Sequence, residues 1–341
     1  MLRNFSFTRL KQAQKGLAGA RRTAICALVA ATAAATAVSA DTLAQPKDTS
    51  LERAAADYIR YREDVAALEA MPFDNANVTR EAHRRLAAHS PDKLSNGWVA
   101  YAALVAADTP EFAAAVKQEV KKKGNKRRGV LGGKQGFMSN VAQDPKYIRK
   151  LPGADKAVAA VLAMTAQDGA RITTLGEAFK TQAYAMQKTK WGKARISSSQ
   201  ERIQEAASFG KTRGAAPAPA LTRSLDDGVM APVLASAKGE WKSDWGPAAP
   251  AGRMSEANAE VIMDRILNLA ARYSTDSLNP KIVSVYAKNN KSQRCLEMSR
   301  LTLAQCIAAT RTPYEEAFCL GEHGLNDIAS CTGWVGGGAS G

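Results

Sequence analysis

The chain has 341 residues, with 47 Lys and Arg against 32 Asp and Glu, which gives a formal net charge of +15. This length suffices for two modest domains with hydrophobic cores. The positive charge favours anionic partners. Beyond residue 40 no apolar run approaches the ~20 residues of a membrane span, which argues against a stable membrane span in the rest of the chain.

The N-terminus has the pattern of a secretion signal. Residues 1–22 hold six basic and no acidic residues, and residues 23–40 are apolar and rich in Ala and Thr. The triplet Val-Ser-Ala that ends at Ala40 matches signal-peptidase cleavage before Asp41. An uncleaved anchor is the alternative, although Ala and Thr form membrane spans poorly. The paired arginines at 21–22 leave Sec and twin-arginine export both open.

Cleavage removes six positive charges and no negative ones, so the formal net charge falls from +15 to +9. The exported chain is still basic. We expect it in the periplasm or secreted, where the anionic partners are envelope polymers, lipid surfaces and proteins rather than nucleic acid.

Helix signals recur along the remaining chain. A capping box, Thr49-x-x-Glu52, opens the first predicted helix, and Pro72 follows its end. A capping residue directly before proline predicts further helix starts at Ser90-Pro91, Thr109-Pro110 and Thr312-Pro313. A second capping box, Ser198-x-x-Glu201, predicts another.

Residues 154–192 contain no proline and carry apolar residues at helical spacing. Asp168 interrupts this apolar face beside Gly169, so the segment is one long helix or two helices broken there. No alternating β-branched segment of convincing length occurs. The sequence therefore predicts an all-α fold, a helical bundle.

Small residues and proline dominate residues 210–254, which predicts a linker or irregular segment. It separates an N-terminal helical domain (49–209) from a C-terminal one (255–335), with a flexible tail at 336–341. The alternative is one continuous bundle with long loops.

Four cysteines remain after cleavage, because Cys26 leaves with the signal. An even set on an exported chain predicts disulfides. Cys295 and Cys306 are eleven residues apart, about 16 Å along a helix, whereas bridged Cα atoms lie ~4.4–6.8 Å apart. The same objection holds for Cys319 and Cys331, twelve residues apart, so both bridges must cross between helices.

An antiparallel helical hairpin that turns near residues 311–313 selects the pairs Cys306–Cys319, near the turn, and Cys295–Cys331, at the open end. The hairpin resembles, in architecture alone, the twin-cysteine helical hairpins of several unrelated small proteins. Its cysteine spacings differ from theirs, so no family is implied.

The twelve-residue spacing creates a geometric problem, because on an ideal helix it leaves Cys331 about 120° off the face of Cys319. We expect Gly321 and Gly324 to absorb this twist by bending or breaking the second helix. Zinc, with His323 nearby, is the rival explanation of the cysteines. Structural zinc sites use pairs of cysteines two to four residues apart, and no two cysteines of this sequence have that spacing. We therefore predict no metal and no cofactor.

Residues 117–134 are strongly basic, with eight Lys and Arg against Glu119. They run from a helix end into a glycine-rich turn whose amides could face an anion. A solvated helix end explains the pattern equally well. The candidate anion-binding residues are Lys121, Lys122, Lys123, Lys126, Arg127, Arg128 and Lys134.

No motif names a reaction. The hypothesis is an exported, non-enzymatic cell-envelope protein that contacts an anionic polymer or protein partner through the basic loop. The alternative is an envelope hydrolase of the peptidoglycan type, with a carboxylate and histidine as acid and base. Its candidate residues are Glu315, Glu316, Glu322 and His323.

His83 and His89 are six residues apart and form no ligand pair. Trp241 and Trp245 are four residues apart, and we interpret them as buried core side chains rather than as rings that stack on sugars.

Overall fold

A computed structural model describes residues 50–196, 198–204, 207–208, 221–223, 232–234 and 257–336. The predicted signal segment 1–40, Cys26, Thr49, Trp241 and Trp245 lie outside these residues, as does most of the predicted tail.

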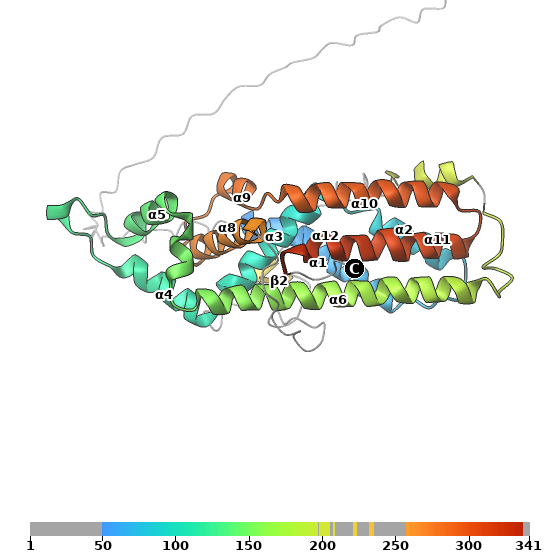
Figure 1. The fold of residues 1–341 in the computed structure, drawn as a ribbon, viewed down its shortest axis with the longest axis horizontal. Helices are drawn as coiled ribbons and strands as arrows, with labels where there is room; N and C mark the ends of the chain where they lie inside the picture. The colour runs from blue at the N-terminus through green and yellow to red at the C-terminus, as the bar shows by residue number, and fades with distance from the viewer. Residues whose placement is uncertain are drawn as a thin grey trace, which may run out of the picture. The chain divides into compact units, whose positions relative to one another are not determined.

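Helices make up almost all of the described elements (Figure 1). The α-helices are α1 (Ser50–Glu69), α2 (Asn77–Leu86), α3 (Pro91–Ala107), α4 (Pro110–Lys121), α5 (Gly133–Gln143), α6 (Ala154–Met186), α8 (Ala257–Ser274), α9 (Pro280–Tyr286), α10 (Asn290–Ala309), α11 (Pro313–Cys319) and α12 (Asp327–Gly333). Short 3₁₀-helices are η1 (Lys126–Arg128), η2 (Pro145–Lys150) and η4 (Trp334–Gly336), and η3 (Leu320–Asn326) is a π-helix. Two three-residue strands, β1 (Leu221–Arg223) and β2 (Pro232–Leu234), pair antiparallel with Leu221 opposite Leu234. Apart from this ladder the fold is all-α, as predicted.

Proline starts three helices where the sequence predicted them. The α3, α4 and α11 helices begin at Pro91, Pro110 and Pro313. A capping box closes the start of α11, because the Thr312 amide donates to Glu315 Oε2 at 3.0 Å. Glu315 is thus a structural residue at a helix end.

Helices from both predicted helical segments contribute to one hydrophobic core, within a compact unit that spans Pro46–Gly341. The α3 helix lies at its centre, packed against α1, α6, α8 and α10. Nearly every residue of α3 from Leu94 to Ala107 is buried, which explains why this helix is apolar on all sides. The predicted boundary at 210–254 therefore separates two stretches of sequence that pack against each other.

The segment around Asp168 is one uninterrupted helix, α6, of 33 residues. Its buried carboxylate has partners on α1. Tyr58 Oη donates to Asp168 Oδ2 at 2.9 Å, and Arg62 Nη2 donates to Asp168 Oδ1 at 3.2 Å. Arg62 Nη1 also donates to Tyr101 Oη of α3 at 2.6 Å. The polar residue that interrupts the apolar face of α6 therefore connects α6 to α1, and Arg62 extends the network to α3.

Burial raises the pKa of Asp168, and the nearby Arg62 guanidinium acts in the opposite direction. Desolvation therefore consumes part of the attraction between the two charges. What the pair supplies is a fixed register of α6 against α1, since removing either partner takes the ion pair away from a buried charge.

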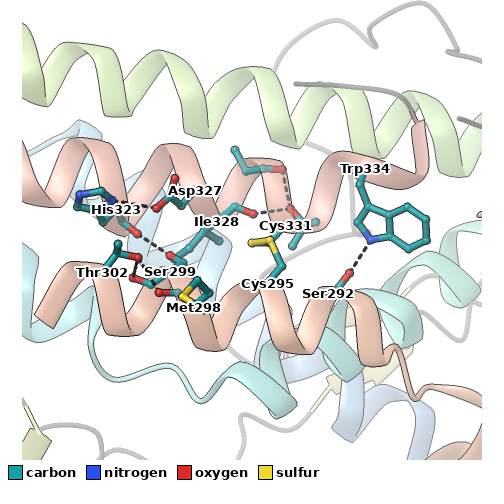
Figure 2. The surroundings of a disulfide bond; sticks show 12 residues. Ser292, Cys295, Met298, Ser299, Thr302, His323, Asp327, Ile328, Cys331 and Trp334 are labelled. Carbon is teal, nitrogen blue, oxygen red and sulfur yellow. Dashed lines mark hydrogen bonds and ion pairs between the residues drawn. A yellow bond between two sulfur atoms is a disulfide. The ribbon is translucent and has the colours of Figure 1, made fainter. Parts of the chain in front are cut away.

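The C-terminal region is the predicted disulfide-stapled hairpin. Disulfides join Cys306 to Cys319 near the turn and Cys295 to Cys331 at the open end, with Cα–Cα distances of 5.7 and 5.4 Å. Figure 2 shows the second bridge between α10 and α12, beside a hydrogen bond of 2.8 Å from Trp334 Nε1 to Ser292 Oγ. Both predicted pairings are confirmed.

The second arm of the hairpin accommodates its twelve-residue cysteine spacing without a break. The chain continues from α11 through the π-helix η3 into α12. A π-type turn adds one residue to the helical repeat, and one residue corresponds to about 100° of rotation. Twelve residues on this arm thus span nearly the same angle as eleven residues on α10. Gly321 and Gly324 both lie in η3, where the twist was expected, but the helix widens rather than breaks.

Two glycines let η3 and α6 approach closely. A Cβ atom on Gly176 would lie 2.8 Å from Gly321 O, and one on Gly321 would lie 2.6 Å from Gly176 O. Both distances are shorter than real Cβ contacts allow. The crossing therefore requires glycine on both helices. Gly169, two turns earlier on α6, faces open space, since a Cβ atom added to it would meet nothing within 4 Å.

Among the described residues, no single helix has both the length and the apolarity to cross a bilayer. The α3 and α4 helices satisfy the two conditions only when taken together, and they meet at a bend of 81°.

We expect D168N to lower the free energy of unfolding by about 3–5 kcal/mol, because the buried Arg62 guanidinium loses its ion pair with Asp168. Urea denaturation monitored by circular dichroism measures this loss. The control D155N, at the exposed start of α6, should cost at most ~1 kcal/mol through the helix dipole. A double-mutant cycle of R62M and D168N should give a coupling energy of about 0.5–3 kcal/mol. Additive losses would contradict the pairing.

We expect G176A and G169A to have opposite effects, although both add one methyl group to α6. The Cβ of G176A collides with the Gly321 carbonyl, which should destabilise the fold by about 1–3 kcal/mol. The Cβ of G169A meets nothing, and alanine should stabilise the helix by up to ~1 kcal/mol. Thermal unfolding of both variants tests the crossing. Equal stability of the two would refute it.

Candidate functional site

The basic segment forms a hairpin between α4 and α5, which we call the basic hairpin (residues 121–134). Asn125 and Val130 form an isolated antiparallel bridge, and the turn between them is η1. The Asn125 side chain accepts from Arg127 N at 3.1 Å, and Gly129 closes the turn with φ 66°. The turn therefore has a defined backbone conformation.

The neck of the basic hairpin is a contact between backbones. A Cβ atom on Gly132 would lie 1.9 Å from Gly124 N, and one on Gly124 would lie 2.4 Å from Gly132 N. Gly133 N donates to Lys122 O at 2.8 Å just below this contact. Only glycine fits at positions 124 and 132, so these two glycines hold the two arms of the hairpin together.

Residues 121–131 are all exposed. Two of the seven candidate anion-binding residues have partners within the protein. Lys122 Nζ pairs with Glu119, which raises the pKa of this lysine, and Lys134 Nζ donates to the carbonyl oxygen of Asp276 at 2.6 Å. No ion pair within the described part of the chain involves the other five, which are Lys121, Lys123, Lys126, Arg127 and Arg128.

Two exposed aliphatic side chains adjoin these cations. Val130 and Leu131 are 55% and 54% exposed, although residues of this type are usually buried. The basic hairpin therefore presents positive charge and apolar surface together. The sequence predicted its charge but not this apolar component.

A pocket on another part of the fold brings together the three histidines of the chain, His83, His89 and His323. They come from α2, from the loop before α3 and from η3. No sequence pattern indicates this convergence, because the histidines are far apart or badly spaced and the packing of α2 against η3 unites them. We call it the histidine pocket.

Each of these histidines has a carboxylate partner. His89 Nε2 lies 2.7 Å from Asp64 Oδ2, His323 Nδ1 lies 2.9 Å from Asp327 Oδ2, and His83 Nδ1 lies 3.4 Å from Glu316 Oε1. Such contacts fix the orientation of an imidazole ring.

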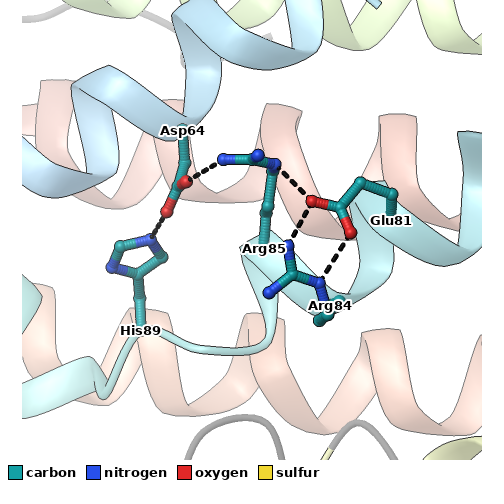
Figure 3. A network of polar contacts seen from close by, with 5 residues as sticks. All are labelled: Asp64, Glu81, Arg84, Arg85 and His89. Atoms are coloured by element: carbon teal, nitrogen blue, oxygen red, sulfur yellow. Dashed lines mark hydrogen bonds and ion pairs between the residues drawn. The ribbon is translucent and has the colours of Figure 1, made fainter. Parts of the chain in front are cut away.

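The pair that involves Asp64 extends into a chain of charges (Figure 3). Asp64 Oδ1 accepts from Arg85 Nη1 at 2.9 Å, and Arg85 Nε lies 2.7 Å from Glu81, which also pairs with Arg84. The hydrogen bonds from Arg84 lower the pKa of Glu81. The charges of α2 are therefore largely neutralised by one another and by α1.

The four candidate acid–base residues do not converge on one pocket. Glu315 caps α11, Glu316 is buried against Arg202 and His83, and Glu322 pairs with Lys180 at 2.8 Å. Only His323 lines the histidine pocket. Each carboxylate thus has a structural partner.

The zinc alternative for the cysteines is excluded, because all four sulfurs are in disulfides and none is available as a thiolate. Among the described residues no group of His, Cys, Asp and Glu has an arrangement that could hold a metal ion.

No protein-family model matches the chain, and no curated protein or solved structure is detectably similar to it. Its function must therefore be inferred from its own surfaces.

Proposed function

We propose that the protein is an exported, non-enzymatic component of the cell envelope that contacts an anionic polymer or protein partner through the basic hairpin. The observation that carries this proposal is the set of five exposed cations on the hairpin that have no acidic partner among the described residues. Such a surface raises the local concentration of anions and steers them to it.

The backbone of the hairpin supports the same proposal. A flexible basic loop loses conformational entropy when it binds, whereas the Gly124–Gly132 contact and the Asn125–Val130 bridge already define this one. Val130 and Leu131 add apolar contact area beside the charges, which suits a partner with both anionic and apolar groups.

The hydrolase alternative has less support. Acid–base catalysis needs two groups within reach of one substrate, and the carboxylates considered for it are occupied in separate structural contacts.

The two disulfides indicate an oxidising, extracytoplasmic environment. Together with the signal pattern of residues 1–40, they support a periplasmic or secreted location.

We expect the exported protein to begin at Asp41, because the residues up to Ala40 match a signal-peptidase site. Intact-mass measurement on protein recovered from the envelope fraction tests this. A mass that still includes residues 1–40 would favour an uncleaved anchor.

We expect charge reversal of the hairpin, K123E/K126E/R127E/R128E, to weaken retention on anionic surfaces at least ten-fold and to leave the fold intact. These positions are exposed, so the change removes electrostatic attraction without disturbing the core. Co-sedimentation with peptidoglycan sacculi and with vesicles that contain phosphatidylglycerol measures retention. Wild-type retention should fall with salt, because exposed charges are screened within ~10 Å at 0.1 M.

The matched control reverses four other exposed cations, K188E/K190E/K193E/R195E, and so changes the net charge equally. It should retain binding within about two-fold of the wild type. Equal losses in both variants would mean that net charge alone attracts the protein. Retention that neither reversal affects would leave the hairpin as a merely solvated surface.

A further inference from the structure

The histidine pocket has room for a small ligand. Its volume is about 160 Å³. An engineered apolar cavity of ~150 Å³ holds a benzene molecule. The pocket is therefore suited to an apolar group of about six carbon atoms.

The walls of the pocket are mainly aliphatic. They come from α2 and α3 in the N-terminal part of the chain and from α10, η3 and α12 in the C-terminal part, with a further side from residues 203 and 207. Leu86, Leu94, Leu296 and Leu303 are each at most 8% exposed, so packing against the core holds these walls in place. The body of a ligand would accordingly be apolar.

The charged groups around the pocket favour an anion at its mouth. Arg300 of α10 lines the pocket, is exposed, and has no ion pair with any described residue. Three carboxylates near the pocket, among the residues that the structure describes, are already engaged: Asp64 by His89 and Arg85, Glu316 by His83 and Arg202, and Asp327 by His323. Glu297, one turn before Arg300, accepts from Gln293 at 3.0 Å.

His323 supplies a second polar group. Asp327 engages its Nδ1, and its Nε2 has no hydrogen-bond partner among the described residues. The side chain of His323 is 23% exposed, so its ring can meet a ligand. As Figure 2 shows, the His323 ring and Asp327 lie along one side of the second hairpin arm. Protonated His323 donates a hydrogen bond from Nε2.

We propose that the histidine pocket binds a small monocarboxylate with an apolar body of about six carbon atoms. The carboxylate pairs with Arg300 and accepts a hydrogen bond from Nε2 of the protonated His323 ring, and the apolar body lies between the leucines of α2, α3 and α10. This site is separate from the basic hairpin and does not depend on the function proposed for it.

The experiment uses the oxidised, processed chain and NMR titration with hexanoate, hexanol and hexylamine. These probes share one apolar chain and differ in head-group charge. Hexanoate should bind with a Kd on the order of 1 mM or tighter, and hexanol should bind at least ten-fold more weakly. R300Q should weaken hexanoate about ten-fold and leave hexanol unchanged. The control R294Q, an exposed arginine on the same helix that does not line the pocket, should bind hexanoate like the wild type.

A second pair of variants tests the place of binding. A304F puts a phenyl ring into the pocket wall and should abolish hexanoate binding, whereas A308F, one turn later on an exposed face of α10, should not. Circular dichroism and disulfide content show that both variants fold. Three results would each overturn the proposal: no binding of hexanoate to the wild type, unchanged binding to A304F, or hexylamine binding as tightly as hexanoate.

Discussion

The buried pair of Arg62 and Asp168 fixes where the longest helix of the fold must lie. A carboxylate in the middle of the apolar face of α6 can be buried only where a cation and hydrogen-bond donors meet it. Arg62 and Tyr58 on α1 provide both, and Tyr101 Oη on α3 accepts a further hydrogen bond from the guanidinium. The three helices therefore share one register, and the position of α6 in turn determines where the second arm of the C-terminal hairpin can pack.

That arm meets α6 at the Gly176–Gly321 crossing, where the backbones touch. The disulfides clamp the same arm to α10 from the other side. They close loops with sequence separations of 36 and 13 residues, for which the chain-entropy relation gives about 4 and 3 kcal/mol. The π-helix lies between these restraints. The π-helix lets Cys319 and Cys331, which are twelve residues apart, both face α10, which a regular α-helix would not do. It also places Gly321 against α6.

Local and pairwise features of the structure could be predicted from the sequence. Proline at a first helical position after a capping residue, and the pairing of the cysteines, each depend on short spacings and on helix geometry alone. The angular mismatch of Cys331, together with Gly321 and Gly324, located the irregular segment, although a bend or break was expected where a π-helix occurs. The partner of Asp168 could not be found in this way, because it lies 106 residues away and only the packing of α6 on α1 brings them together.

The same limit explains why the candidate sites were predicted unequally. The basic hairpin is contiguous in sequence, so its charge was visible, but the pairing of Lys122 with Glu119 and the exposure of Val130 and Leu131 depend on the fold. The residues of the histidine pocket are separated in the sequence and meet only in the folded chain, so no sequence spacing predicts the pocket. Its His323 lies in the π-helix, whose extra residue the cysteine spacing requires. The same π-helix lies between Cys319 and Cys331, so the segment that carries the imidazole is also the segment that lets Cys331 face Cys295.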